Sequence, residues 1–467
     1  MRTRTVLWFV LVCSLALLLT RSMSARIASG VISVNPSIRH QVMTGWEAAI
    51  LGTVNDYKNY NTPGFNKLLD QAVSDMGMTR LQLGVFPGME SSFDSGLGYL
   101  NGTISEQTWV TTYLYTSVND NPDSNVINPN GFHWTILDWE IDNLVLQIKQ
   151  RVQARGEKLY TYVSFTDYGT SPFEHWSTPS EYAEFMLAIF NHMQGKYGFV
   201  PDGINVINEP GYNNDWTGTA IGNVIAATGP RLAAAGYHPD FMAASTVDMG
   251  QAPAFFDAIV AVPGAGPYLK EISYHRYGQT GGIASLQNIA SRAVTYGMRT
   301  VMNEWWTTAN TYRTLHQDLK IGRNSSWQQA AIGGVNGYYS VNYTTGSISI
   351  TPKTHFLRQY YKYVRPGAQR IEATTTDSTF DPVAFVNKDG SYVTVIKAES
   401  AGDLLITNLP AGVYRIFYTT AGEFDVQRPN VTLAAGQTLN THIPDIGVIT
   451  ISGGVVPKKA RSQLTSQ

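Results

Sequence analysis

Short apolar runs alternate with amphipathic segments along most of the chain. The strand-like runs cover residues 41–48, 79–85, 159–165, 203–207, 240–245, 271–277, 299–304 and 335–341. Several place Ile and Val at successive positions, which is typical of parallel strands buried on both faces. Helical apolar spacing covers residues 65–76, 137–154, 180–193 and 285–296. Eight strand–helix units in series predict an α/β fold, the (β/α)8 TIM barrel.

Signals at helix ends support this interpretation. Pro179, Ser180 and Glu181 form a helix start, and Gly156 directly after Arg155 forms a helix stop. The structural alternative is a doubly wound sheet. Such a sheet usually carries a Gly-rich phosphate-binding turn after its first strand, and the sequence after residues 41–48 shows none. We therefore expect a barrel over residues 39–365.

A different pattern begins after the Val-Arg-Pro-Gly sequence at 364–367. Short alternating strands follow at residues 383–387, 392–398, 403–407, 412–419 and 430–433. With Gly-containing turns between them, they predict a β-sandwich over residues 366–453. We expect an N-terminal strand within residues 26–38 to join it. Residues 454–467 are polar and basic and predict a flexible tail.

The first residues have the pattern of a secretory signal peptide. Arg2 and Arg4 precede an apolar run over residues 6–19, and small residues around Ala25 offer a cleavage site. The sequence thus predicts a signal peptide over residues 1–25 and a secreted protein. An uncleaved signal anchor is the alternative. The rest of the sequence contains no apolar run long enough to cross a bilayer, so we expect no membrane contact after cleavage.

Composition narrows the possible functions. Hydrophobic residues make up 43% and charged residues 15% of the 467 residues, which suits a large folded core. A net charge of −2 gives no electrostatic basis for nucleic-acid binding. The only cysteine is Cys13, and the histidines lack metal-ligand spacing. We therefore expect a monomer without metal or cofactor.

Residues 87–134 form a long irregular segment that we expect to wall a cleft.

Two of the buried runs end in a glutamate. Glu209 follows the fourth strand, and Glu304 ends the seventh. A carboxylate beside a buried strand is costly unless it is paired or used, and in a barrel both would reach the C-terminal rim, where active sites lie. Two carboxylates facing one cavity are the groups that cleave glycosidic bonds. Glu209 suits the acid/base and Glu304 the nucleophile, with Asn208 placed to bond a sugar 2-hydroxyl.

These motifs resemble those of the retaining glycoside hydrolases of clan A, and most closely those of glycoside hydrolase family 30. The Asn-Glu pair at 208–209 with Glu304 carries the clan pattern, and the Arg-Leu-Gln-Leu-Gly sequence at 80–84 is similar to a strand of the family. The resemblance implies that Arg80 supports the nucleophile. Residues 360–367, 384–390 and 393–396 resemble the passage into the family's side β-domain. The chain departs from the family at Gly45-Trp46-Glu47 and around Glu304.

Further residues follow strands and are candidates for substrate binding. They are Trp46, Glu47, Asp167, Tyr168, Trp216, His275, Tyr277 and Trp305. Glu47 is a possible third carboxylate of the cleft, or the partner of a nearby Arg. The resemblance to clan A implies that a residue at the end of the sixth strand bonds the nucleophile, and a structural role is the alternative for His275. Of the adjacent Trp305 and Trp306, we expect at least one in the core.

The sequence thus predicts a secreted retaining glycoside hydrolase that acts on a carbohydrate by double displacement. We favour an endo-acting enzyme on β-1,6-galactan or β-1,6-glucan, because export suits polymer degradation. Xylanase or glucosylceramidase-like activity is the alternative within the family. A clan A enzyme of another family, such as a mannanase or cellulase, and a non-catalytic carbohydrate-binding barrel are the other hypotheses.

Overall fold

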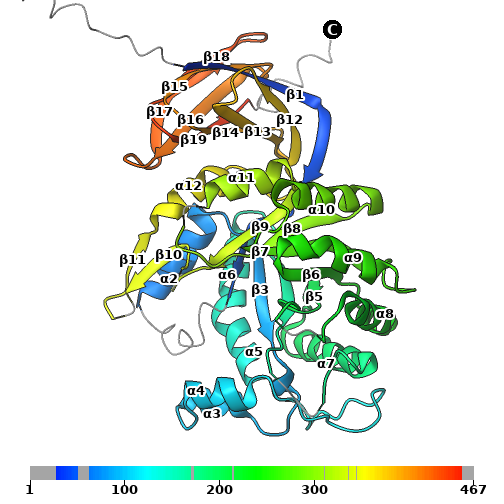
Figure 1. Cartoon of the computed structure of the whole chain (residues 1–467). Helices are drawn as coiled ribbons and strands as arrows, with labels where there is room; N and C mark the ends of the chain where they lie inside the picture. The colour runs from blue at the N-terminus through cyan, green and yellow to red at the C-terminus, as the bar shows by residue number, and fades with distance from the viewer. Residues whose placement is uncertain are drawn as a thin grey trace, which may run out of the picture.

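The computed structural model describes residues 28–50, 63–169, 173–212, 215–309, 311–334, 336–342 and 344–454 of the chain. The predicted signal peptide and the predicted tail beyond residue 454 lie outside these ranges. Figure 1 shows a barrel of strands and helices beside a separate layered β-domain. Within the described ranges, no helix has the length and apolarity needed to cross a membrane.

Eight parallel strands close into a barrel, which confirms the predicted fold class. They are β2 (Glu47–Ala49), β3 (Arg80–Val85), β4 (Tyr160–Phe165), β5 (Gly203–Asn205), β6 (Asp240–Asp248), β7 (Leu269–Gly278), β8 (Arg299–Glu304) and β9 (Asn324–Ala331). Strand β2 pairs with both β3 and β9, so the sheet has no free edge. Glu209 and Glu304 therefore follow the fourth and seventh barrel strands, as the sequence predicted.

Helices surround the barrel, and their ends follow the sequence signals. The main ones are α2 (Pro63–Asp70), α5 (Thr135–Glu140), α6 (Leu146–Ala154), α7 (Pro179–Tyr197), α8 (Gly218–Ala234), α9 (Ala252–Val260), α10 (Gly282–Tyr296), α11 (Tyr312–Lys320) and α12 (Pro352–Tyr361). Helix α7 begins at Pro179, whose fixed φ and missing N–H suit a first turn. After α6 the backbone of Gly156 takes φ 73°, where glycine avoids the Cβ clash.

Two of the predicted barrel strands were wrong. The eighth barrel strand is β9, whereas the predicted run at 335–341 overlaps β10 (Tyr339–Asn342), which pairs with β11 (Ser347–Ile350) outside the barrel. The first barrel strand is β2 and not residues 41–48. Residues up to Val42 instead continue β1 (Ala28–Val42), because Val42 pairs with Gln369 of the β-domain.

The β-domain is a sheet of nine strands with its own apolar core. After β1 they are β12 (Gln369–Thr375), β13 (Phe380–Val386), β14 (Tyr392–Ala398), β15 (Gly402–Thr407), β16 (Gly412–Thr420), β17 (Val426–Leu433), β18 (Leu439–Ile443) and β19 (Gly447–Gly453). Strand β1 lies between β12 and β15, so the two ends of the chain build one sheet. The sequence did not predict β12, β18 or β19 as strands.

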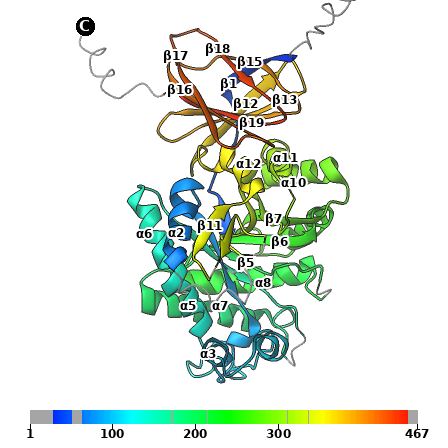
Figure 2. The same ribbon diagram turned by 90° about the vertical axis from the view of Figure 1, so that its left-hand side faces the viewer.

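Helices α11 and α12 lie between the barrel and the β-domain (Figure 2). Gln359 of α12 contacts two strands of the sandwich: its side chain donates to Thr419 Oγ1 at 2.9 Å, and its carbonyl accepts from Thr450 Oγ1 at 2.8 Å. Arg358 donates to Asp425 at 2.6 Å. The junction is therefore hydrogen-bonded as well as packed, which fixes one domain against the other.

The middle of the barrel interior is polar. Ser164, Asn205, Ser245, Ser273 and Asn303 come from five consecutive strands, β4 to β8, and all are buried. Ser245 Oγ lies at the centre: it donates to Asn205 at 2.8 Å, accepts from Asn303 at 2.9 Å, and lies 2.8 Å from Ser273 Oγ. Asn205 Nδ2 also donates to Ser164 at 2.9 Å. This hydrogen-bonded layer ties the strands that support the rim.

Candidate active site

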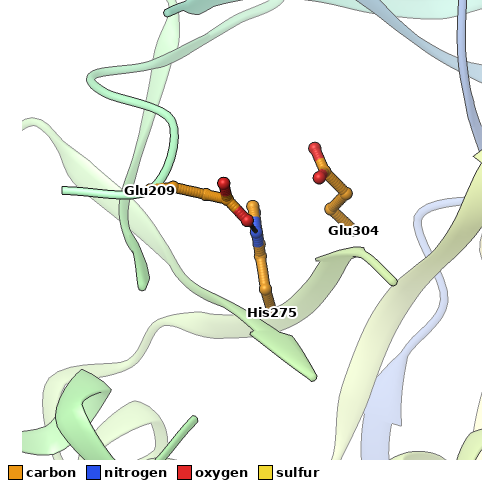
Figure 3. A group of neighbouring side chains, drawn as sticks. All are labelled: Glu209, His275 and Glu304. Carbon is orange, nitrogen blue, oxygen red and sulfur yellow. Dashed lines mark hydrogen bonds and ion pairs between the residues drawn. The ribbon is translucent and has the colours of Figure 1, made fainter. Parts of the chain in front are cut away.

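Glu209 and Glu304 meet at the C-terminal rim of the barrel. Glu304 is the last residue of β8, and Glu209 lies four residues beyond the end of β5. Figure 3 shows their carboxylates approaching each other from opposite sides, with His275 of β7 between them. One oxygen of each carboxylate and one imidazole nitrogen all lie within 4.8 Å of one another. The barrel therefore brings together two carboxylates that are 95 residues apart in the sequence.

The backbone and two neighbouring side chains hold Glu209 in place. Its φ is 55°, a left-handed conformation that is strained for a residue with a Cβ. Its amide donates to the carbonyl of Ser245 at 3.1 Å. His275 Nδ1 lies 2.9 Å from Oε1, and the Tyr168 hydroxyl donates to Oε2 at 2.8 Å. Each carboxylate oxygen thus has its own hydrogen-bond partner.

Glu304 is held by a tyrosine and is harder to ionise than an ordinary glutamate. The Tyr277 hydroxyl donates to Glu304 Oε1 at 3.0 Å, and accepts from the backbone amide of Trp306 at 3.1 Å. Burial raises the pKa of Glu304 above its usual value, and the nearby charge of Glu209 adds to the rise. The hydrogen bond from Tyr277 opposes this shift without cancelling it.

A cavity of about 420 Å³ opens in front of Glu304. Its wall is a mixture of apolar, aromatic and neutral polar side chains. The described residues that line it are Ala49, Gln82, Gly84, Phe86, Leu114, Tyr115, Ser164, Thr166, Tyr168, Asn208, Tyr277, Glu304 and Trp306. This is the size and chemistry of a small-ligand site, with a few polar groups on an apolar wall. Leu114 and Tyr115 belong to the long segment that we expected to wall the cleft.

Several of the residues predicted from the sequence lie at this cavity. Asn208, Tyr168 and Tyr277 line it together with Glu304. His275 is fully buried and is not among the described lining residues, but it contacts Glu209 at 2.9 Å. Of the adjacent tryptophans, Trp306 lines the cavity, whereas Trp305 packs against the barrel core. Trp306 therefore takes the place at the cavity that the sequence assigned to Trp305.

Arg80 and Glu47 lie at the opposite end of the barrel. Both are first residues of their strands, β3 and β2, and both are fully buried. Arg80 contacts Glu47 at 2.6 Å and Glu271 at 2.8 Å, and Tyr162 donates to Glu47 at 3.1 Å. The first residues of the parallel strands lie at the N-terminal end of the barrel, opposite the C-terminal rim. The predictions that Arg80 supports the nucleophile and that Glu47 lies in the cleft are therefore wrong, whereas the alternative, that Glu47 pairs with a nearby Arg, is confirmed.

Trp46, Trp216 and Asp167 also face away from the cavity. Trp46 is fully buried, stacks on Tyr361 at 4.2 Å and donates to the carbonyl of Val364. Trp216 is fully buried in the main core. Asp167 is 3% exposed, while its neighbours Thr166 and Tyr168 line the cavity. These three were predicted to bind substrate. The structure places Trp46 and Trp216 in the core instead, and Asp167 is buried and not among the described lining residues.

The sequence did not single out several residues of the cavity wall. Gln82 and Gly84 alternate with buried Leu residues in β3, and Ser164 and Thr166 follow the same alternation at the end of β4. Such period-two spacing identifies the inward face of a strand, but only once its register is known. Phe86 and Tyr115 belong to irregular segments, where no periodic signal exists.

Glu209, His275 and Glu304 have the residue types of a metal site. Two carboxylates and an imidazole can hold a divalent cation, and the three offer donor atoms within 4.8 Å of one another. Their hydrogen bonds already provide partners for one oxygen of Glu304 and both oxygens of Glu209. The same arrangement suits a pair of catalytic carboxylates with an orienting histidine, which requires no ion.

Comparisons with known proteins found a family match in the β-domain and several similar folds. Residues 367–407 match the glycosyl hydrolase family 30 beta sandwich domain. The whole chain is similar in fold to a family 30 endoxylanase from Clostridium papyrosolvens, with 17% identity, a TM-score of 0.62, and 91% of this chain and 99% of that chain covered.

Two further structures show the same fold. A family 30 subfamily 8 xylanase from Clostridium acetobutylicum has 16% identity and a TM-score of 0.63, with 91% of this chain and 99% of that chain covered. An endo-β-1,6-glucanase has 17% identity and a TM-score of 0.62, with 91% and 94% covered. Together the shared fold and the sandwich match support a glycoside hydrolase. They confirm the resemblance to glycoside hydrolase family 30.

Proposed function

We propose that the protein is a retaining glycoside hydrolase that cleaves β-glycosidic bonds by double displacement. The observation that carries the proposal is the separation of Glu209 and Glu304, whose nearest oxygens lie within 4.8 Å at one rim. Retaining enzymes hold their carboxyl groups roughly 5 to 5.5 Å apart, and inverting enzymes roughly 6.5 to 9.5 Å, to admit a water between them. The short separation favours the retaining arrangement.

In the first step Glu304 attacks the anomeric carbon of a sugar bound in the cavity. The glycosidic C–O bond breaks, its electron pair goes to the leaving oxygen, and Glu209 gives that oxygen a proton. The Tyr277 hydroxyl orients the attacking carboxylate. In the second step a water attacks the same carbon, Glu209 takes its proton, and the bond to Glu304 breaks. Both carboxyl groups return to their starting state.

The cavity wall supports a neutral sugar as substrate. Its described residues include neutral hydrogen-bonding groups on Gln82, Ser164, Thr166 and Asn208, and no Lys, Arg or His. A uronic acid would need a cation or bidentate guanidinium for its carboxylate. We therefore favour the β-1,6-galactan or β-1,6-glucan expected from the sequence over an acidic glycan, with a xylan as the alternative neutral polymer.

We also propose that the protein is exported and acts as a monomer. The basic residues Arg2 and Arg4 before the apolar run at 6–19 support export. N-terminal sequencing of protein recovered from the medium tests the cleavage site near Ala25. Size-exclusion chromatography with light scattering tests the monomer, for which a mass near 51.4 kDa, less the cleaved peptide, is expected.

One experiment tests both the reaction and its stereochemistry. The protein is incubated with β-1,6-galactan, β-1,6-glucan, neutral xylan, glucuronoxylan and aryl β-glycosides, and the products are followed by proton NMR from the first turnover. We expect hydrolysis of a neutral β-glycan with the β-anomer released first, because two inversions restore the configuration. Initial release of the α-anomer contradicts the retaining mechanism, and no release from any substrate contradicts the hydrolase.

A further inference from the structure

The hydroxyl group of Tyr168 lies between the cavity and the carboxylate of Glu209. Its oxygen is 2.8 Å from Glu209 Oε2 and 2.9 Å from Asn208 Nδ2. The amide of Asn208 donates to the hydroxyl oxygen, so the hydroxyl hydrogen is directed to the carboxylate. The ring of Tyr168 lines the cavity and is 43% exposed. Asn208 thus orients Tyr168, and Tyr168 contacts Glu209.

The two oxygens of Glu209 differ in their access to substrate. Oε1 faces His275 Nδ1 at 2.9 Å, and His275 is fully buried. Oε2 faces Tyr168 at the cavity wall. Glu209 is 6% exposed and is not among the described lining residues, whereas Tyr168 is, so the Oε2 side of the carboxylate is the side nearer the cavity. To exchange a proton, a glycosidic oxygen must come within hydrogen-bond reach of Oε2. The hydroxyl of Tyr168 donates its hydrogen bond to this same carboxylate oxygen.

We propose that Tyr168 is a positioning residue that sets how tightly Glu209 holds its proton. This inference rests on the proposed function and goes beyond the sugar contact expected for Tyr168 from the sequence. A hydroxyl that donates to a carboxylate stabilises the ionised form and so lowers the carboxyl pKa. Tyr168 would then favour the ionised Glu209 needed in the second step, at the expense of the protonated form needed in the first.

Tyr168 is equipped to remain a donor over the working pH range. Burial raises the pKa of Tyr168 above its ordinary value, and the charges of Glu209 and Glu304 raise it further. The phenol therefore keeps its proton wherever the carboxylates titrate. The ring is also supported from both sides, by Tyr115 at 5.7 Å and Tyr212 at 5.9 Å between ring centroids.

The pH dependence of Y168F tests this role. The basic limb of kcat/KM reports loss of the proton from the catalytic acid. Without the hydroxyl, Glu209 holds its proton longer, and we expect the basic limb to move up by about one pH unit. A residue that only contacts the sugar would change KM and leave the limb in place. An unmoved basic limb overturns the proposal, as does movement of the acidic limb alone.

Two matched variants control the result. Y277F removes the hydroxyl that donates to Glu304 at 3.0 Å, so it should raise the acidic limb and leave the basic limb unchanged. Y115F removes a hydroxyl from the same cavity wall, and no hydrogen bond joins Tyr115 to either glutamate among the described contacts. It should move neither limb, whatever its effect on KM. Thermal unfolding of each variant checks that the fold is retained.

A second measurement separates this inference from the proposed function. If the unmodified protein hydrolyses no substrate, the proposed function fails, but the contact can still be tested. The full-length protein is labelled with carboxyl-¹³C glutamate, and the E209Q variant identifies the Glu209 signal. A Glu209 titration about one pH unit higher in Y168F supports the inference. An unchanged titration overturns it, whether or not the protein is an enzyme.

Discussion

Each end of the barrel interior holds a pair of glutamates, and the groups that contact them differ between the two ends. At the N-terminal end, Glu47 and Glu271 are fully buried against the guanidinium of Arg80. Glu271 also contacts Arg299 at 2.8 Å. Burial raises the pKa of Glu271, but the charges of Arg80 and Arg299 outweigh burial, so its pKa lies below its usual value. At Glu47 burial outweighs the charge of Arg80, so the pKa of Glu47 lies above its usual value.

At the C-terminal end the glutamates lack such cations. Among the described residues, no Lys or Arg lies within 4.0 Å of Glu209 or Glu304. Tyrosine hydroxyls and one imidazole contact them instead. Burial raises the pKa of Glu304, whereas the two arginines lower the pKa of Glu271. The arginines thus tie Glu47 and Glu271 into the fold, whereas hydroxyl groups and an imidazole hold Glu209 and Glu304 at the rim.

The largest expected effect is the loss of activity in E304Q. The amide cannot attack the anomeric carbon, so kcat/KM should fall by at least about 10⁴-fold, the scale on which enzymes lose activity with their nucleophile. The melting temperature should stay the same or rise, because the variant removes a carboxylate that is costly to bury. Steady-state kinetics and thermal unfolding measure both.

Glu106→Gln is the matched control for this prediction. Glu106 lies in the first turn of α4 (Glu106–Thr108), on the long segment and outside the cavity lining. Its activity should equal that of the unmodified protein. Near-normal turnover in E304Q would show that Glu304 is not the nucleophile.

Replacement of Arg80 should act on stability and leave the chemistry largely intact. R80M leaves Glu47 and Glu271 buried around an apolar side chain, and removing one partner of a buried ion pair costs about 3–5 kcal/mol. Urea unfolding measures the loss. For comparison, R292M breaks the Arg292–Asp257 pair at the surface and should cost less than about 1 kcal/mol.

The kinetics of folded R80M decide where Arg80 acts. A residue at the far end of the barrel should leave kcat within about threefold, since distant sites couple weakly. A fall in kcat comparable to that of E304Q, with stability retained, would show that Arg80 supports the nucleophile, as the sequence alone predicted.

A smaller effect concerns the acidic limb of the pH profile. The nucleophile must be ionised, and the pKa of Glu304 is raised above 4.5, so kcat/KM should fall on acidification at a pH above 4.5. A carboxyl pKa raised on folding favours the folded state below the unfolded pKa, and that advantage is lost as pH rises through the folded pKa. The stability gain of E304Q should therefore be absent at low pH and grow on the alkaline side. A constant difference contradicts the shift.

The smallest expected effect is that of chelation. Tyr168, His275 and Tyr277 already contact the two carboxylates, so dialysis against EDTA should leave kcat/KM and the melting temperature unchanged. A large loss that Ca²⁺ or Zn²⁺ restores would instead assign Glu209, His275 and Glu304 to a metal site.

Strand type and order could be predicted from the sequence, but strand register could not. The runs that end at Glu209 and Glu304 are apolar at successive positions. Their burial could therefore be predicted without knowing which side chains face inward. Strand β9 reads Asn-Ser-Ser-Trp-Gln-Gln-Ala-Ala and has no apolar pattern, because its side chains bond inside the barrel. Gln328, for example, donates to Gln82 and to Tyr162, each at 3.2 Å. A buried polar strand resembles a loop when only one sequence is known.

The errors in the site have the same origin. A shift of one residue turns a strand side chain to the opposite face. Asp167 follows the end of β4 between Thr166 and Tyr168, which line the cavity, yet it is buried and is not among the described lining residues. Arg80 was assigned to the cleft because of a family motif, although its place at the start of β3 directs it to the other end of the barrel. Motif and order singled out the two glutamates that meet at the rim, whereas the direction of each side chain could be known only from the fold.

The hydrogen-bonded layer in the middle of the barrel has a consequence for how this chain tolerates mutation. An apolar core accepts exchanges among Leu, Ile and Val when volume is kept. Around Ser245, any apolar replacement leaves Asn205 or Asn303 with an unpaired polar group. In a library of random variants, substitutions at these positions should be depleted more strongly than in the apolar core of the β-domain. Sequence drift in this protein should therefore be slowest directly beneath the two glutamates.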